Sequence, residues 1–150
     1  MITKEMRRKV MMIANYLFHK CGYVQSNAMR TAWKLIKTDN IETRVAGVTF
    51  ENRQRILHKV SVCYPDVAVQ LCREKSNEHD ANAVAVYAVV HSKYRAKIGY
   101  LPAKVAAVVA TLLDKGMNVA TSRFRIVGGL DPEYPTYGAR LMLSLREERT

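Results

Sequence analysis

Six short runs rich in Val, Ile and Tyr lie between residues 43 and 146, and residues typical of turns separate most of them. Several runs alternate apolar and polar residues, which is the period of a strand with one buried face. The runs cover residues 43–49, 67–72, 83–90, 96–101, 119–127 and 140–146. This pattern predicts a β-rich domain with short strands.

Two helical patterns interrupt the strands, a brief one over residues 52–59 and a stronger one over residues 102–115. Pro102 suits the first position of the stronger helix, and Gly116 suits its end. Its apolar stripe comprises Val105, Val108, Val109, Leu112 and Leu113. Six strands with one or two helices predict a mainly β domain with added helices (α+β), folded as a partly open, OB-like six-stranded β-barrel.

Residues 1–40 have a different character, because they are basic and helical in pattern. Apolar residues recur there at three- and four-residue steps, after a fair N-cap at Thr3 and before a fair stop at Gly22. A second helix is expected after Ser26 and should extend to Ile36. We therefore expect two parts, a helical hairpin in residues 1–40 and the barrel in residues 43–146.

The charge of the chain favours a polyanionic partner. There are 24 Lys and Arg against 13 Asp and Glu, which gives a net charge of +11 and an isoelectric point near 9.8. Such an excess raises the local concentration of nucleic acid around a protein. The alternative is a generally basic, solvated surface. The pattern of the hairpin only weakly indicates helices that read a groove of DNA. Its apolar side chains would equally dock a neighbouring domain, a second copy or a larger partner; they include Met11, Met12, Tyr16 and Trp33.

Other classes find little support. The nearly charge-free stretch 105–113 is too short to span a bilayer, and no secretory signal opens the chain. Cys21, Cys63 and Cys72 form no Cys-x-x-Cys pair, so we expect them to be reduced thiols. We expect the protein in the cytoplasm, associated with the nucleoid if the source is bacterial. The histidines and carboxylates show no spacing typical of a metal or hydrolytic site. We expect no enzyme activity, no cofactor and no metal; the oligomeric state stays open.

The middle of the chain resembles the HIRAN domain, the DNA-binding module of the helicase-like transcription factor and its yeast relatives. The resemblance rests on the run from Arg73 to Val86 (REKSNEHDANAVAV), on KIGYLP at residues 97–102 and on the apolar helix that follows. VAGVTF at residues 45–50 is similar to the family's first strand. The whole arrangement looks like a stand-alone bacterial or phage-type protein. The family implies an OB-like barrel that binds single-stranded DNA and prefers a free 3′-hydroxyl end.

The resemblance also implies roles for particular residues. Asp80 matches the acid that accepts a hydrogen bond from the terminal 3′-hydroxyl, and a carboxylate suits this role because it accepts from a hydroxyl and repels a phosphate. His79 and Phe50 match aromatic residues that stack on bases, Phe50 in the first strand. Asn77 and Asn82 match polar positions of the loop.

This chain departs from the family at two positions, where Thr49 and Ala103 replace cations. Arg53, Arg55 and Lys104 lie nearby in the sequence and are the expected substitutes. Without them, contacts to the DNA backbone would be weaker, and the alternative of a barrel that has lost its ligand stays open.

Every proposed site residue also has a structural interpretation. Asn and Asp are favoured in turns, Phe50 also suits a core, and Tyr100 suits a packed ring with a wet hydroxyl. Tyr134 and Tyr137 lie in a turn-rich loop, where they would either close over a bound DNA strand or cap the barrel. The sequence thus predicts a non-catalytic module that binds single-stranded DNA or DNA ends in replication or repair. The alternative is an assembly module that docks a larger nucleic-acid-processing protein through residues 1–40.

Overall fold

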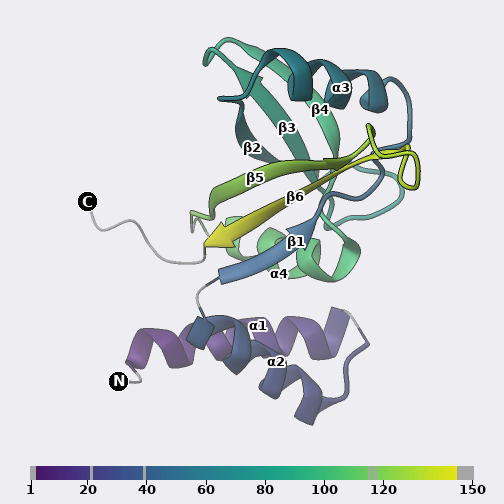
Figure 1. The fold of residues 1–150 in the computed structure, drawn as a ribbon. Coiled ribbons are helices and arrows are strands. Elements are labelled where there is room, and N and C mark those ends of the chain that lie inside the picture. The colour runs from purple at the N-terminus through teal and green to yellow at the C-terminus, as the bar shows by residue number, and fades with distance from the viewer. Residues whose placement is uncertain (1–2, 21, 39, 115, 117, 145–150) are drawn as a thin grey trace.

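The computed structural model describes residues 3–20, 22–38, 40–114, 116 and 118–144. These residues form helices and strands that are interspersed along the chain (Figure 1). In chain order the elements are α1 (Lys4–Lys20), α2 (Gln25–Thr38), β1 (Asn40–Arg44), α3 (Arg53–Cys63), β2 (Ala68–Arg73), β3 (Val84–Val90), β4 (Tyr94–Tyr100), α4 (Ala103–Asp114), β5 (Ala120–Gly128) and β6 (Tyr137–Ser144).

The predicted limits of α1 are confirmed. The hydroxyl of Thr3 accepts a hydrogen bond from the Met6 N–H at 3.1 Å, which is the geometry of an N-cap. Gly22 follows the helix with φ +72°, a conformation that suits glycine at a helix end. The second helix starts two residues earlier than expected, at Gln25, so Ser26 lies inside its first turn and is not its N-cap.

The two N-terminal helices form the predicted hairpin and pack on α4. Val10, Ile13 and Leu17 of α1 are buried against Ala28, Ala32 and Ile36 of α2, which is the expected apolar stripe. Val108 and Leu112 of α4 belong to the same buried cluster, and Figure 1 shows α4 between the hairpin and the sheets. The hairpin therefore shares a buried core with α4.

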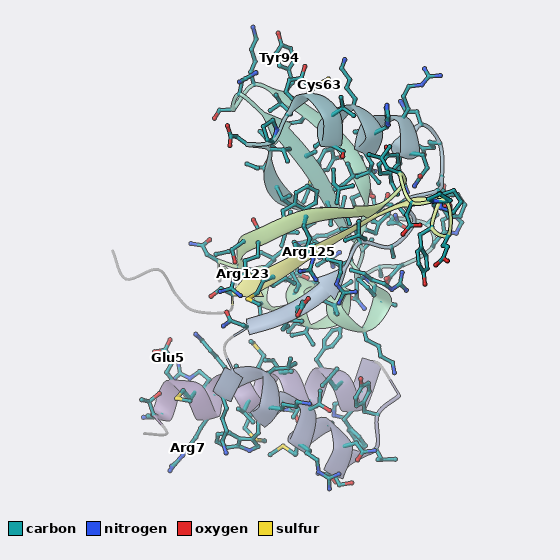
Figure 2. All side chains as sticks on the ribbon, viewed as in Figure 1. Glu5, Arg7, Cys63, Tyr94, Arg123 and Arg125 are labelled. Carbon is teal, nitrogen blue, oxygen red and sulfur yellow. The ribbon has the colours of Figure 1, made fainter. Side chains whose placement is uncertain are left out.

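The apolar side chains suggested for docking a partner are only partly available. Met12 and Trp33 are partly buried against the hairpin cluster, whereas Met11 is 48% exposed. Tyr16 is half-buried. Arg7 lies on the side of α1 that faces away from the sheets (Figure 2).

The strands form two antiparallel three-stranded sheets, with orders β1-β6-β5 and β2-β3-β4. The α+β class is confirmed, but the described residues do not form the single six-stranded barrel that we expected. Between the sheets, Ala46 pairs with Tyr100 in an isolated bridge, and the Thr121 hydroxyl donates to the Val69 carbonyl oxygen at 3.0 Å. The chain turns at Gly47 (φ +71°) immediately after that bridge, so a continuous ladder cannot develop there.

Most predicted strands appear within three residues of their expected limits. The first is the exception, because β1 starts at Asn40 and ends at Arg44, and residues 47–50 form a turn. Residues 145 and 146 of the last predicted strand lie outside the described residues, as does Cys21. α3 extends beyond its prediction to Cys63.

The predicted helix after Pro102 lies at the centre of the molecule. All residues from Ala106 to Leu112 are buried in α4. Val109 and Ala110 join Val86, Ile98 and Leu141 in the cluster that both sheets share. Because this helix packs on the sheets on one side and on the hairpin on the other, it holds the three layers together.

Candidate nucleic-acid interface

A pocket of about 610 Å³ lies where the segment after β1 crosses the end of β4. It brings together six of the ten predicted site residues, from three separate parts of the chain. Its lining comprises Ala46, Gly47, Phe50, Glu51, Arg53, Asn77, His79, Asp80, Ala83, Tyr100 and Leu101.

The first wall of the pocket is the turn after β1. Ala46 and Tyr100 exchange two backbone hydrogen bonds, of 2.7 and 2.9 Å, and the turn at Gly47 then directs Phe50 outward. The Phe50 ring is 66% exposed. The expectation that Phe50 belongs to the first strand is therefore wrong, because the strand ends at Arg44, but its ring is open to a ligand at the pocket.

Arg53 supplies the cation of the pocket. Its side chain is buried at the start of α3, where Nη1 donates to the Gly47 carbonyl oxygen at 2.7 Å and Nη2 lies 3.7 Å from Glu51 Oε1. The guanidinium also lies 5.3 Å from the centre of the Tyr100 ring. Among the described residues, Arg53 Nε is a buried polar atom without a hydrogen-bond partner. An unsatisfied buried donor costs free energy, and the rest of the guanidinium is held by Gly47, Glu51 and Tyr100.

The second wall is the loop between β2 and β3, which Asn77 organises. Its Oδ1 accepts hydrogen bonds from the His79 and Asp80 N–H groups at 2.9 and 3.1 Å. Asp80 Oδ1 in turn accepts from the Asn82 N–H at 2.9 Å. No donor or cation among the described residues contacts Asp80 Oδ2. Asn77 and Asn82 therefore hold the loop, and Asp80 keeps one carboxylate oxygen for a ligand.

A charged network that the sequence analysis missed connects the two walls. Lys97 Nζ lies 2.7 Å from Glu74 Oε2 and donates to the Tyr100 hydroxyl at 2.9 Å. That hydroxyl donates to Glu74 Oε1 at 2.9 Å, and Asn77 Nδ2 donates to the same oxygen at 3.2 Å. No sequence spacing indicates this network, because the pairing of β2, β3 and β4 alone brings Glu74 and Lys97 together.

The network shifts the pKa values of both charged groups. Burial alone would raise the pKa of Glu74, but hydrogen bonds from Lys97, Asn77 and Tyr100 outweigh it and lower the pKa below its ordinary value. Hydrogen bonds to Glu74 and Tyr100 raise the pKa of Lys97 above its ordinary value. Both groups are therefore charged at neutral pH and anchor the Tyr100 hydroxyl.

Four of the predicted site residues lie outside the pocket. Asn82 and the exposed Lys104 do not line it. Arg55 does not line it either, so Arg53 is the only one of the three cations expected to compensate for Thr49 and Ala103 that lines the pocket. Tyr134 is 66% exposed and lines a separate groove of about 500 Å³.

Tyr137, in contrast to Tyr134, is buried. Its side chain is only 8% exposed, and its hydroxyl lies 2.6 Å from His58 Nδ1. Its backbone N–H and carbonyl both bond to the Gln54 side chain at 2.8 Å. The suggestion that this ring closes over a bound DNA strand is therefore wrong, because the ring belongs to the core.

The described residues contain no group of three or more His, Cys, Asp and Glu side chains that could hold a metal ion. None of the described helices is long and apolar enough to cross a membrane. Cys63 and Cys72 are free thiols.

Comparison with known proteins places this pocket inside a family match. The family model described as the HIRAN domain matches residues 38–137, which include both walls of the pocket. No curated protein and no solved structure matches the chain at a significant level.

Proposed function

Because the chain belongs to the HIRAN domain family, whose domain is a nucleic-acid-binding module, we propose that its pocket binds the 3′-hydroxyl end of single-stranded DNA. The observation that carries the proposal is the convergence of Phe50, His79, Asp80 and Arg53 on one cavity. Each supplies a different part of end recognition.

The two exposed rings, Phe50 and His79, offer faces on which the last bases stack. Asp80 Oδ2 accepts a hydrogen bond from the terminal hydroxyl and repels a terminal phosphate. The Arg53 guanidinium attracts the internucleotide phosphate, and its fixed orientation reduces the entropy lost on binding. A module of this preference fits replication or repair, where free 3′ ends arise.

Fluorescence anisotropy with labelled ten-nucleotide strands tests the proposal. The wild-type protein should bind a 3′-hydroxyl strand more tightly than a 3′-phosphate strand. Asp80→Asn should lose this preference, because the amide oxygen still accepts from the Asn82 N–H but no longer repels phosphate. Phe50→Leu should weaken binding of both strands by about tenfold, the effect of losing one stacked base.

Glu78→Gln is the matched control, because Glu78 is exposed on the same loop and does not line the pocket. It removes the same charge and should leave the preference intact. Equal wild-type affinity for the two strands would overturn end recognition. If the control variant loses the preference as Asp80→Asn does, the loss arises from the change in net charge and not from Asp80.

A further inference from the structure

The outer face of the sheet β2-β3-β4 continues from the pocket. Residues paired across neighbouring strands share a face of the sheet, so the register defines rows on it. The row Cys72–Ala85–Tyr100 adjoins the pocket through Tyr100. The next row is Gln70–Tyr87–Lys97, and the third is Ala68–Val89–Arg95. The opposite face, with Val86, Ala88 and Ile98, is buried in the core.

Cations and rings alternate along this face. Lys97 Nζ lies 4.9 Å from the centre of the Tyr100 ring and 5.9 Å from the centre of the Tyr87 ring. The Arg95 guanidinium lies 4.6 Å from the centre of the Tyr87 ring. Together with Arg53 over Tyr100, these contacts form an unbroken series from the pocket to the exposed Arg95.

The residues that flank Tyr87 on this face have short side chains. Ala68, Cys72, Ala85 and Val89 lie in the two neighbouring rows, and of these Ala85 is fully buried. Gln70 is exposed and directly opposite Tyr87 on β2. The middle row thus presents an amide, a ring and a cation side by side.

The two cations near Tyr87 differ in availability. Lys97 is paired with Glu74, so its charge is largely neutralised. Among the described residues, Arg95 has no carboxylate within ion-pair distance. Arg95 is therefore the cation on this face that remains available for a phosphate.

We propose that this face is a second nucleotide-binding subsite, which receives the nucleotides next to the strand end held in the pocket. Tyr87 and the Arg95 guanidinium offer flat surfaces on which a base stacks, Gln70 reaches a base edge, and Arg95 contacts a phosphate. The subsite rests on the proposed function, because the pocket has to bind the strand end for the strand to follow this path.

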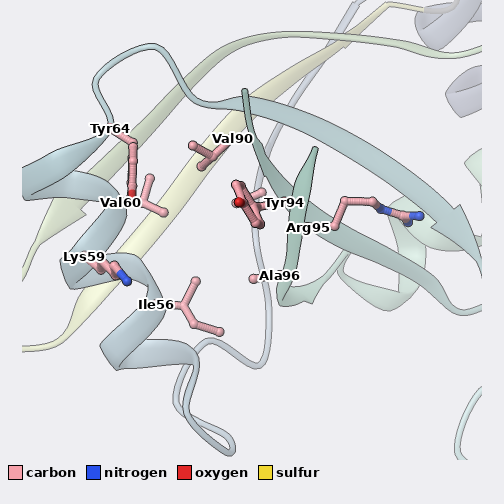
Figure 3. Close-up of a pocket in the computed structure, with 9 residues that line it drawn as sticks. Ile56, Lys59, Val60, Tyr64, Val90, Tyr94, Arg95 and Ala96 are labelled. Atoms are coloured by element: carbon pink, nitrogen blue, oxygen red, sulfur yellow. The ribbon is translucent and has the colours of Figure 1, made fainter. Parts of the chain in front are cut away.

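The neighbouring Tyr94 provides a matched control. Tyr94 and Arg95 are adjacent on β4 and point in opposite directions (Figure 3). Tyr94 points into a cavity of about 480 Å³ beneath α3, near Val60 and Ala96. It is 62% exposed and Lys93 Nζ lies 5.3 Å from its ring centre, so it has the same chemistry as Tyr87 but lies on the other face.

The experiment compares a thymidine dinucleotide with a thymidine octanucleotide, each with a 3′-hydroxyl. The wild-type protein should bind the octanucleotide more tightly. Tyr87→Leu should weaken octanucleotide binding by about tenfold and leave dinucleotide binding unchanged, since the loss of one stacking ring affects only the longer strand. Arg95→Gln should reduce the slope of log K against log salt by about 0.7 for the octanucleotide alone.

Tyr94→Leu should leave the binding of both strands unchanged. The subsite is overturned if the dinucleotide binds with its 3′-hydroxyl preference but the longer strand gains no affinity, or if Tyr94→Leu weakens binding as much as Tyr87→Leu. If neither strand binds, or if neither distinguishes hydroxyl from phosphate ends, the proposed function itself fails. Arg95 is exposed, so Arg95→Gln tests the subsite even if Tyr87→Leu affects folding.

Discussion

Gly99 and Ala46 approach so closely that a side chain on Gly99 would overlap the Ala46 carbonyl oxygen and the Val45 side chain. This approach allows Ala46 and Tyr100 to exchange the two hydrogen bonds that close one side of the pocket. The glycine of the Gly-Tyr-Leu sequence is therefore explained by the proximity of two backbones and not by contact with a ligand.

Gly99→Ala should destabilise the fold by about 1–3 kcal/mol, because an added methyl group would collide with a backbone atom that cannot rotate away. It should weaken oligonucleotide binding as well, since the bridge positions Arg53 and Tyr100. Urea unfolding monitored by circular dichroism measures the stability. Gly138→Ala is the control: the nearest atom to its added carbon is a Val127 side-chain methyl at 3.2 Å, so its effect should be smaller. An equal loss in the two variants would contradict this explanation.

The Glu74 and Lys97 pair should give the protein a defined pH range of stability. The pKa of Glu74 is lowered in the folded state, so its contribution is fully present above its unfolded pKa and is lost as the pH falls through the lower folded pKa. The pKa of Lys97 is raised, so its contribution is fully present below its unfolded pKa and is lost as the pH rises through the folded value. Between these limits both contributions should be constant.

Glu74→Gln should therefore be less stable than the wild type at pH 7, and the difference should shrink as the pH falls below the ordinary glutamate pKa of 4.5. Chemical unfolding over a pH series measures it. Glu78→Gln, on the exposed part of the same loop, should leave the pH profile unchanged. A stability difference for Glu74→Gln that stays the same down to the acid transition would exclude a role of its ionisation.

Tyr137 should act on stability and not on binding. Tyr137→Phe removes the hydroxyl that contacts His58 Nδ1 and should cost about 1 kcal/mol, the typical net value of one hydrogen bond. Its oligonucleotide affinity should equal that of the wild type. Thermal unfolding and anisotropy on the same preparation measure both quantities. A loss of affinity without a loss of stability would show that Tyr137 takes part in oligonucleotide binding.

The hairpin should be required for the stability of the whole chain. Its removal would expose Val108 and Leu112 on α4, which are 4% and 2% exposed in the intact molecule. Leu112→Ala should cost about 2–5 kcal/mol, whereas Met11→Ala, on the exposed side of α1, should be close to neutral. Differential scanning calorimetry compares the variants. A shortened protein lacking residues 1–38 that melts at the wild-type temperature would show that the hairpin is an independent part.

Much of the architecture could be predicted from local patterns. The stripe of Val10, Ile13 and Leu17 predicts a helix with one buried face, and Pro102 and Gly116 delimit α4, because neighbours along the chain decide helical periodicity and capping. The loop residues Asn77 and Asp80 were also identifiable, since their turn chemistry acts over two or three residues.

The amino-acid sequence by itself thus determined most of the helices and strands, the excess of positive charge, and six of the residues that meet at the pocket. Only the tertiary structure decided that the strands form two sheets, that Phe50 lies in a turn, that Tyr137 is buried, and that Glu74 pairs with Lys97. The physical reason is that these features depend on strand register and on contacts between residues far apart in the chain, which local propensity does not specify.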